Sequence, residues 1–218
     1  MTSAQRGYHH GDLHNALIIA AAELIESQQS VHFSMSDAAK KAGVSSAAPY
    51  RHFNDRDALL EAVRDLAFIG LYDRMLNASK QTQSGSVEQI IALGNAYIDY
   101  AQEKQVFFSL MWEASGDTAS RHESARTKGA GFQVLVEALN CYVARHAPDT
   151  AYPTLRLATQ LWSMVHGVAT LECNQILDAF DPDVQSRQLV VEGTRALLGT
   201  IGAERHITTP TQHSLAID

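Results

Sequence analysis

The stretch Ser34–Phe53, SMSDAAKKAGVSSAAPYRHF, decides the fold. Ser34 and Asp37 have the spacing of a capping box, in which a serine and an acidic residue three positions later each accept a hydrogen bond from the other's backbone N–H. A helix is therefore predicted to begin at Met35. Gly43 is suited to the left-handed conformation that commonly ends a helix, so this helix is predicted to stop there.

A second short helix is predicted to follow after a turn of only a few residues. Ser45 is its cap candidate, and residues 46–53 would form its body. Pro49 would lie in the first turn, where a missing backbone N–H costs least. The small residues Ala39 and Gly43 lie where the two helices must approach each other. This order of features is typical of a helix-turn-helix; the alternative is a helical hairpin inside an ordinary bundle.

Helices are also predicted on both sides of this motif. Apolar residues recur at spacings of three and four over residues 13–27, which is the helical period, and Asp12 is the cap candidate before them. The pair Asn54-Asp55 is predicted to cap a further helix that continues to about residue 77. The first third of the chain is therefore expected to hold four helices.

The remainder of the chain is also helical in pattern, and no period-two strand pattern is convincing. Helices are predicted at about 87–103, 105–115, 121–146, 154–178 and 183–200. The predicted fold class is all-α, with a three-helix DNA-binding domain of the helix-turn-helix kind, a helical C-terminal domain and about nine helices in total. The predicted limits are 1–70 for the first domain, 71–201 for the second and 202–218 for a disordered tail.

The charge distribution bears on whether such a motif can bind DNA. The chain has a formal net charge of −7, which argues against a nucleic-acid partner. Locally the sign reverses, because residues 40–56 contain four cations, Lys40, Lys41, Arg51 and Arg56, against the single acid Asp55. This local charge of +3 lies where a DNA contact would be sought.

Composition and the remaining motifs narrow the other classes of function. No signal peptide and no membrane span is apparent, so a cytoplasmic protein is expected. Cys141 and Cys173 are expected to be reduced and buried. His9, His10, Asp12 and His14 could be imagined as a metal site, but a loose arm and a helix cap account better for them. No metal, cofactor or enzymatic activity is predicted, because no catalytic constellation stands out.

Three runs of sequence resemble the tetracycline-repressor (TetR) family. The first is Tyr8-His9-His10-Gly11-Asp12-Leu13, the second is residues 36–45, and the third runs from Pro49 to Leu60. In the second domain, residues 161–167 resemble the Trp-x-x-x-His-Gly signature of one TetR subgroup. The resemblance implies a DNA-binding transcriptional regulator, and it weighs heavily against the hairpin alternative.

The resemblance makes residues 46–52 the recognition helix, inserted in the major groove of DNA. Tyr50 and His52 are implied to bond phosphates, as is Arg56, where the family more often has Lys. Base reading is left to Ser46, Ala47, Ala48 and Arg51, and the guanidinium fork of Arg51 matches guanine O6 and N7. Ser34 completes the predicted DNA-binding set.

The family also implies a ligand pocket and a dimer interface in the second domain. The predicted pocket residues are aromatic, sulfur-bearing or imidazole side chains at helical spacing: Tyr97, Phe108, Met111, Trp112, Trp162 and His166. Most such residues are ordinary core, and a lone histidine such as His166 is more often a hydrogen-bonded structural residue. The predicted dimer interface lies on the last two helices, at Leu155, Ala158, Leu161, Leu189 and Leu197.

These features together predict a homodimeric, ligand-responsive repressor. Its expected partners are double-stranded operator DNA, a second copy of the chain and an unknown small-molecule effector, with no membrane. An activator or multi-target regulator on the same fold stays open at this point. A helical protein-interaction module without specific DNA binding also stays open.

Overall fold

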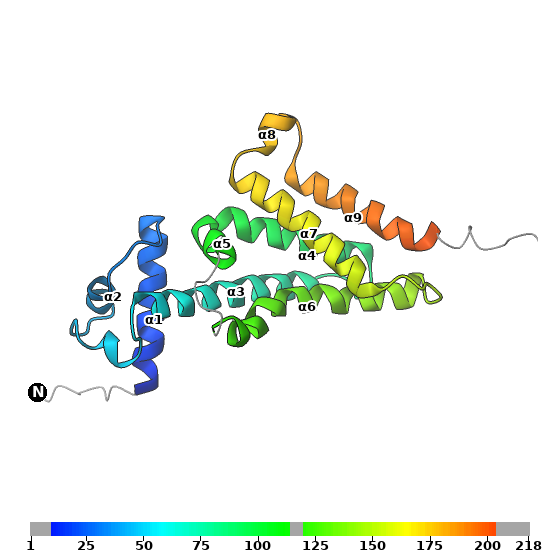
Figure 1. Cartoon of the computed structure of the whole chain (residues 1–218). Coiled ribbons are helices and arrows are strands. Elements are labelled where there is room, and N and C mark those ends of the chain that lie inside the picture. The colour runs from blue at the N-terminus through cyan, green and yellow to red at the C-terminus, as the bar shows by residue number, and fades with distance from the viewer. Residues whose placement is uncertain (1–9, 114–119, 204–218) are drawn as a thin grey trace, which may run out of the picture. The chain divides into compact units, whose positions relative to one another are not determined.

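The structure is a computed structural model that describes residues 10–113 and 120–203, with the side chains of residues 13–113 and 129–201 (Figure 1). The described residues form nine α-helices and one 3-10 helix, without a strand: α1 (His10–Gln28), α2 (Met35–Lys41), η1 (Pro49–Arg51), α3 (Arg56–Lys80), α4 (Val87–Glu103), α5 (Gln105–Trp112), α6 (Ser120–His146), α7 (Thr154–Cys173), α8 (Leu177–Phe180) and α9 (Ser186–Ala203). The all-helical prediction is confirmed.

The chain divides into two compact units. The N-terminal unit comprises Met1–Tyr72 and Glu103–Ala130, and the C-terminal unit comprises Asp73–Gln102 and Gly131–Asp218. Helix α5 therefore belongs to the first unit, although the sequence places it in the middle of the predicted second domain. The domain limits 1–70 and 71–201 stay a prediction, and most of the predicted 202–218 tail lies outside the described residues.

The N-terminal unit is built around one apolar core. Leu17, Ala21 and Ile25 recur on one face of α1 and are fully buried, as the helical period requires. They pack with side chains of the α2 segment and of α3, and Leu110 of α5 is buried in the same cluster. This core fixes the position of the predicted DNA-binding motif. Helix α1 begins at His10, so the prediction that Asp12 caps it was wrong, because Asp12 lies inside the first helical turn.

Local hydrogen bonds set the boundaries of α2 as predicted. The Ser34 side chain accepts a hydrogen bond from Asp37 N (3.1 Å), and Asp37 Oδ2 accepts one from Ser34 N (3.0 Å), so the capping box is complete. The Ser34 hydroxyl, which also donates to Asp37 Oδ2, and then the Ser34 N–H hold the pKa of the Asp37 carboxyl below its ordinary value. After the C-cap Ala42, Gly43 has φ +73°, a left-handed conformation that costs a glycine little.

The predicted second helix of the motif is shorter than expected. Residues 46–48 form turns, and only Pro49–Arg51 is helical, as the 3-10 turn η1. Its N-cap is Ala48, without a side-chain hydrogen bond, so the prediction that Ser45 caps an α-helix over 46–53 was wrong. Pro49 has no N–H to donate to residue 45, which removes a hydrogen bond that a regular α-helix would need.

The beginning of α3 follows the prediction. Asp55 Oδ1 accepts a hydrogen bond at 2.8 Å from the backbone N–H of Ala58, three residues later in the sequence. This is the hydrogen bond that an N-cap side chain makes. The helix then continues to Lys80, slightly beyond the predicted end near residue 77.

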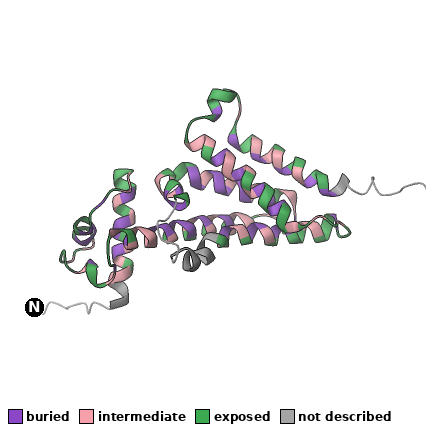
Figure 2. Cartoon of the chain, in the orientation of Figure 1, coloured by how far each residue is buried: buried purple, intermediate pink, exposed green. Residues whose placement is uncertain are grey.

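The C-terminal unit packs α4, α7 and α9 together with parts of α3 and α6. Figure 2 shows buried positions along α4. Leu93, Tyr97 and Ile98 are among the buried residues of this helix. Helices α7 and α9 approach closely at Gly193, where an added Cβ would lie 2.2 Å from Met164 Sδ. The absence of a side chain at this position therefore brings the two helices together.

Two further predictions about this unit were wrong. The helix predicted over 154–178 ends at Cys173, because Asn174 caps it and Gln175 has φ +56°, and the short helix α8 follows separately. Both cysteines are free, but Cys141 is exposed and Cys173 half-buried, whereas both were expected to be buried. None of the helices, within the part of the chain that is described, has the length and apolar character needed to cross a membrane.

Candidate functional site

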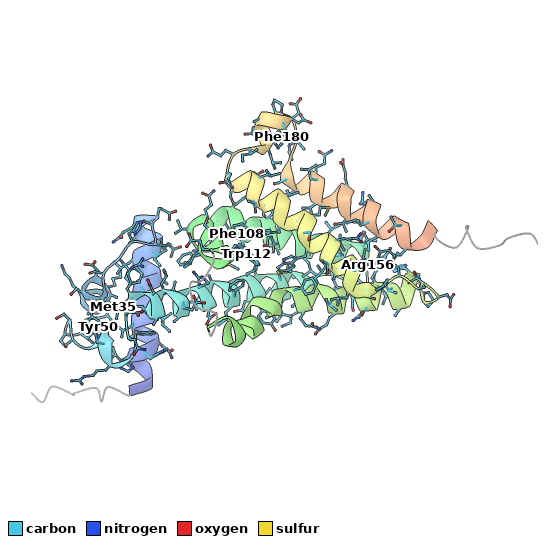
Figure 3. All side chains as sticks on the ribbon, viewed as in Figure 1. Met35, Tyr50, Phe108, Trp112, Arg156 and Phe180 are labelled. Carbon is cyan, nitrogen blue, oxygen red and sulfur yellow. The ribbon has the colours of Figure 1, made fainter. Side chains whose placement is uncertain are left out.

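The turn after α2 presents a small polar and aromatic surface. Ser46, Ala47 and Arg51 are exposed, and Tyr50 is 59% exposed. Figure 3 labels Tyr50 on this turn. Pro49 is buried beneath them and anchors the turn to the core. Arg51 has no acidic partner at ion-pair distance among the described residues, so its guanidinium is available to an external acceptor.

The other two predicted contacts on this turn are less accessible. Ala48 and His52 are half-buried. The His52 ring meets the His14 ring edge to face at 6.1 Å, and His14 in turn stacks on Phe53 at 4.7 Å. The His52 ring is thereby held in one place beside the exposed turn, which suits a hydrogen bond to a fixed phosphate better than adaptable base reading.

The lysines of α2 add to the positive charge of this surface. Lys40 is exposed, and Lys41 forms an ion pair with Glu23 at 3.0 Å. An exposed pair of this kind has little effect on stability but reduces the charge that Lys41 offers to a phosphate. Lys40 and Arg51 therefore provide most of the local positive potential.

Two predicted DNA contacts have structural roles in the chain itself. The Ser34 hydroxyl is used in the capping box, where it also donates to Asp37 Oδ2 at 2.6 Å. Arg56 Nε donates to the Phe33 carbonyl at 2.9 Å, Nη2 donates to the Val31 carbonyl, and the guanidinium lies 5.0 Å from the Phe33 ring centroid. Its Nη1 faces Asp57. Arg56 therefore fixes the loop before α2 to the beginning of α3, and that role is more evident than a phosphate contact.

A small cavity lies within the C-terminal unit, with a volume of about 20 Å³ in which a water molecule can be centred. It is lined by residues of five helices: Met75, Ile90, Leu93, Gly94, Tyr97, Leu135, Leu161, Trp162, Val165 and Thr194. The lining is mainly apolar, as in small-molecule sites, but the space as it stands is that of about one water molecule.

The predicted pocket residues are only partly brought together. Tyr97 and Trp162 line the cavity, with ring centroids 5.1 Å apart in an edge-to-face arrangement. Phe108, Met111 and Trp112 do not line it, because α5 belongs to the N-terminal unit, where Trp112 meets Phe68 at 5.4 Å. Aromatic character alone did not reveal which unit each residue joins.

His166 stands behind the cavity wall. Its Nδ1 lies 2.9 Å from the Tyr97 hydroxyl, and the hydroxyl can donate to this nitrogen when the imidazole is neutral. Burial lowers the pKa of the imidazole below its ordinary 6.5, so the neutral form is favoured near pH 7. The structure thus gives His166 a hydrogen-bonded position outside the lining.

The lowered pKa of His166 predicts a pH dependence of stability. In the unfolded chain the imidazole takes up a proton near pH 6.5, whereas its pKa in the folded chain is lower. The free energy of unfolding therefore decreases as the pH falls below about 6.5. His166→Gln removes the titration and is expected to reduce the loss of stability between pH 7.5 and 5.5, as measured by urea unfolding. An unchanged difference between the two pH values would contradict this assignment.

The predicted dimer residues fall into two groups. Leu155 is 60% exposed, and Leu189 and Leu197 are half-buried, so these three can contact a second chain. Ala158 and Leu161 are 0% and 2% exposed, and Leu161 lines the cavity. Both side chains are covered by this chain itself, because helical spacing identifies an apolar face but not what covers it; their place in a dimer interface stays a prediction.

Sequence reasoning also missed several residues of the site. Met75, Gly94 and Thr194 line the cavity. Only Thr194 stands out in the sequence, as a polar residue in the apolar face of α9. No cluster of three or more metal-ligating side chains occurs among the described residues. Of the imagined metal site, His9 and the side chains of His10 and Asp12 lie outside them.

Two family profiles match the chain. "Bacterial regulatory proteins, tetR family" matches residues 17–63, and "Tetracyclin repressor-like, C-terminal domain" matches residues 90–194. The first range contains the capped helix pair, and the second contains most of the cavity. No curated protein matches the sequence.

Several solved structures are similar in fold. A protein of unknown function from Rhodococcus sp. RHA1 has 26% identity and a TM-score of 0.72, over 90% of this chain and 99% of that one. FadR of Thermus thermophilus, a TetR-family repressor in complex with lauroyl-CoA, has 16% identity and a TM-score of 0.62, over 85% and 93% of the two chains. FadR of Bacillus subtilis in complex with stearoyl-CoA has 13% identity and a TM-score of 0.60, over 87% and 97%.

The two profile matches together span more than half of the chain. One is the profile of the N-terminal part of tetR regulators and the other that of their C-terminal domain. The capped helix pair and the cavity occupy the corresponding residues. The chain belongs to the TetR family of DNA-binding transcriptional regulators.

Proposed function

We propose that this regulator is a ligand-responsive repressor that binds a pseudo-palindromic operator as a homodimer. The observation that carries the proposal is the apolar cavity in the C-terminal unit of a chain whose other unit holds the DNA-binding motif. We assign the limits 1–70 and 71–201 to these two activities.

On DNA, the exposed turn would enter the major groove. Arg51 is proposed to read a guanine, Ser46, Ala47 and Ala48 to face neighbouring bases, and Tyr50 to bond a phosphate. His52 is the second phosphate contact, held by the rings around it. Ser34 and Arg56 then act on DNA mainly by positioning the turn. Two such surfaces in a dimer would lie about 34 to 36 Å apart, one helical turn of DNA.

Replacing Arg51 by Ala is expected to lower selectivity at one base position by about 1 to 3 kcal/mol, because the guanidinium fork is lost. The measurement is a set of single-base operator variants, titrated against the purified protein at fixed salt concentration, after an operator has been selected from random duplexes. Arg156→Ala removes the same charge from an exposed position on α7 and serves as the control. Equal base preferences in both variants would refute the assignment of Arg51.

The effector would act through a difference in affinity. The ligand would bind best to a conformer in which the two DNA-binding units are wrongly spaced for the operator. The ratio of its affinities for the two conformers sets the largest factor by which it can lower operator affinity. The FadR structures with acyl-CoA are examples of ligand-bound relatives. If no molecule that occupies the cavity changes operator affinity, the regulator is not a ligand-responsive repressor.

The remaining features of the proposal concern assembly and context. Leu155, Leu189 and Leu197 are the proposed dimer contacts on α7 and α9. A mass in light scattering that equals one chain at micromolar concentration would contradict the dimer.

We place the protein in the cytoplasm, where its operator would lie, and assign it no enzymatic activity. A reporter gene that falls rather than rises on deletion of the regulator would identify an activator instead.

A further inference from the structure

The segment between α7 and α9 exposes an aromatic side chain. Phe180, at the end of α8, is 73% exposed, more than any other large apolar residue in the described part of the chain. The segment itself is anchored, because Leu177 is 5% exposed and the Ile176 N–H donates to the Leu171 carbonyl at 2.9 Å. We call residues 174–185 the α8 arm. Aromatic side chains are enriched where one protein contacts another, so the end of this arm suits a protein partner.

The charge of the α8 arm is opposite to the charge at the other end of α7. From residue 157 to residue 186 the chain has no lysine or arginine but four acids, Glu172, Asp178, Asp181 and Asp183. At the beginning of α7, Arg156 is exposed and has no acidic partner at ion-pair distance among the described residues. Its neighbour Leu155 is 60% exposed. Each end of α7 therefore combines an exposed apolar side chain with charge, and the two charges have opposite signs.

These two complementary ends are too far apart to meet within one chain. Figure 3 labels Phe180 on α8 and Arg156 toward the opposite end of α7. The helix from Leu155 to Cys173 alone is about 27 Å long, at 1.5 Å for each residue. In a two-fold symmetric pair of chains, a residue of one copy meets a different residue of the second copy, and the same contact occurs twice. Two copies of α7 that run antiparallel would bring each α8 arm to the beginning of the other copy's α7.

Gly167 is suited to the point where the two copies of α7 would cross. A glycine weakens the interior of a helix, and an added Cβ at Gly167 would meet nothing within 4 Å, so packing within the chain does not explain this glycine. It lies 12 residues after Leu155 and 13 before Phe180, close to the middle of the distance between them. Arg156 lies on the same face of α7, about three turns earlier. A crossing at Gly167 would therefore place the complementary ends opposite each other.

We infer that the α8 arm docks on a second copy of this chain, where Phe180 packs on the partner's Leu155 and Asp181 pairs with the partner's Arg156. This inference rests on the proposed function, since it assigns a further contact surface to the proposed homodimer. The surface continues the proposed contacts of α7, because Leu155 belongs to both.

Cross-linking tests the contact directly in the full chain. Cys141→Ser and Cys173→Ser remove the two native thiols, and Leu155→Cys and Phe180→Cys are then introduced together. A short bismaleimide at micromolar protein concentration is expected to convert most of this variant into covalent dimers on a denaturing gel. The length of α7 prevents a link within one chain. Each single cysteine variant is the control and should remain mainly uncoupled. No more covalent dimer in the double variant than in the controls would overturn the inference.

A charge reversal tests the ion pair. Arg156→Glu is expected to raise the Kd of the dimer about tenfold in sedimentation equilibrium, because it places an acid beside the partner's acidic arm. Adding Asp181→Arg should return the Kd to within about threefold of the parent value. Lys80→Glu, the same reversal at an exposed position of α3, is the control. If the second replacement weakens the dimer further, Arg156 and Asp181 do not form a pair.

A larger side chain at position 167 tests the crossing point. Gly167→Leu is expected to raise the Kd of the dimer at least about tenfold, because the leucine would hold the two helices apart. Gly129→Leu is the matched control on α6, since an added Cβ meets nothing within 4 Å there either. Equal dimer affinities of the two variants would show that α7 does not cross its copy at Gly167.

The mass of the parent protein distinguishes the two possible failures. If light scattering gives the mass of two chains while the double cysteine variant fails to cross-link, the homodimer stands and docking of the α8 arm is overturned. If the parent has the mass of one chain at micromolar concentration, the homodimer of the proposed function itself is refuted.

Discussion

Arg64→Ala is expected to lower the free energy of unfolding by about 3 to 5 kcal/mol, because it removes one partner from a buried ionic group. Arg64 on α3 is 5% exposed; its Nε donates to the Leu110 carbonyl at 2.8 Å, and its Nη1 pairs with Glu61. Without the guanidinium, the buried Leu110 carbonyl and the partly buried Glu61 carboxylate lose these bonds. Urea unfolding at fixed protein concentration measures the change.

The control for this prediction is an arginine at the surface. Arg187 pairs with Asp99, but its side chain is 58% exposed, so Arg187→Ala should cost less than about 1 kcal/mol. A double replacement, Arg64→Met with Glu61→Gln, should recover part of the stability, because it removes both charges together. Equal effects of the two alanine replacements would show that burial of Arg64 does not matter.

Gly85→Ala is the second replacement with a large expected effect. Gly85 has φ +68°, and an added Cβ would lie 2.9 Å from the backbone carbon and oxygen of Cys141. The left-handed conformation costs a side chain about 1 to 2 kcal/mol, and the overlap with backbone that cannot rotate away adds about 1 to 3 kcal/mol. Thermal or urea unfolding should therefore show a loss of about 2 to 5 kcal/mol.

Gly43→Ala separates the two contributions. Gly43 has a similar φ of +73°, but an added Cβ meets nothing within 4 Å. This variant is expected to lose only the conformational part, about 1 to 2 kcal/mol. If both variants lose the same free energy, the contact between Gly85 and α6 is not a source of strain.

The parts of the fold that depend on local chemistry could be predicted from the sequence. The Ser34–Asp37 capping box, the left-handed Gly43 and the Asp55 cap are each specified by two or three neighbouring residues, and each occurs as predicted. The 3-10 turn η1 could not be predicted in the same way. Its length depends on Pro49 being buried against the core, which is a tertiary contact.

The cavity shows a second limit of the sequence. Tyr97 and Trp162 were predicted as ligand residues and line it, whereas Phe108, Met111 and Trp112 have the same chemical character and pack in the other unit. Helical spacing gives the apolar face of each helix but not the helix that covers it. Ala158 and Leu161 were assigned to a dimer interface for the same reason, although they are buried within the chain.

The brevity of η1 sets how much sequence information one DNA-binding unit can extract. Between Ser46 and Tyr50 the turn offers Ala47, Ala48 and Pro49, which have no side-chain hydrogen-bonding group, so Arg51 is the main direct reader that we propose. A mismatch at one base typically costs about 1 to 3 kcal/mol. We therefore expect a degenerate half-site. The regulator would then distinguish its operator from competing genomic sites mainly by the repetition of the half-site and by the shape of the DNA between the two copies.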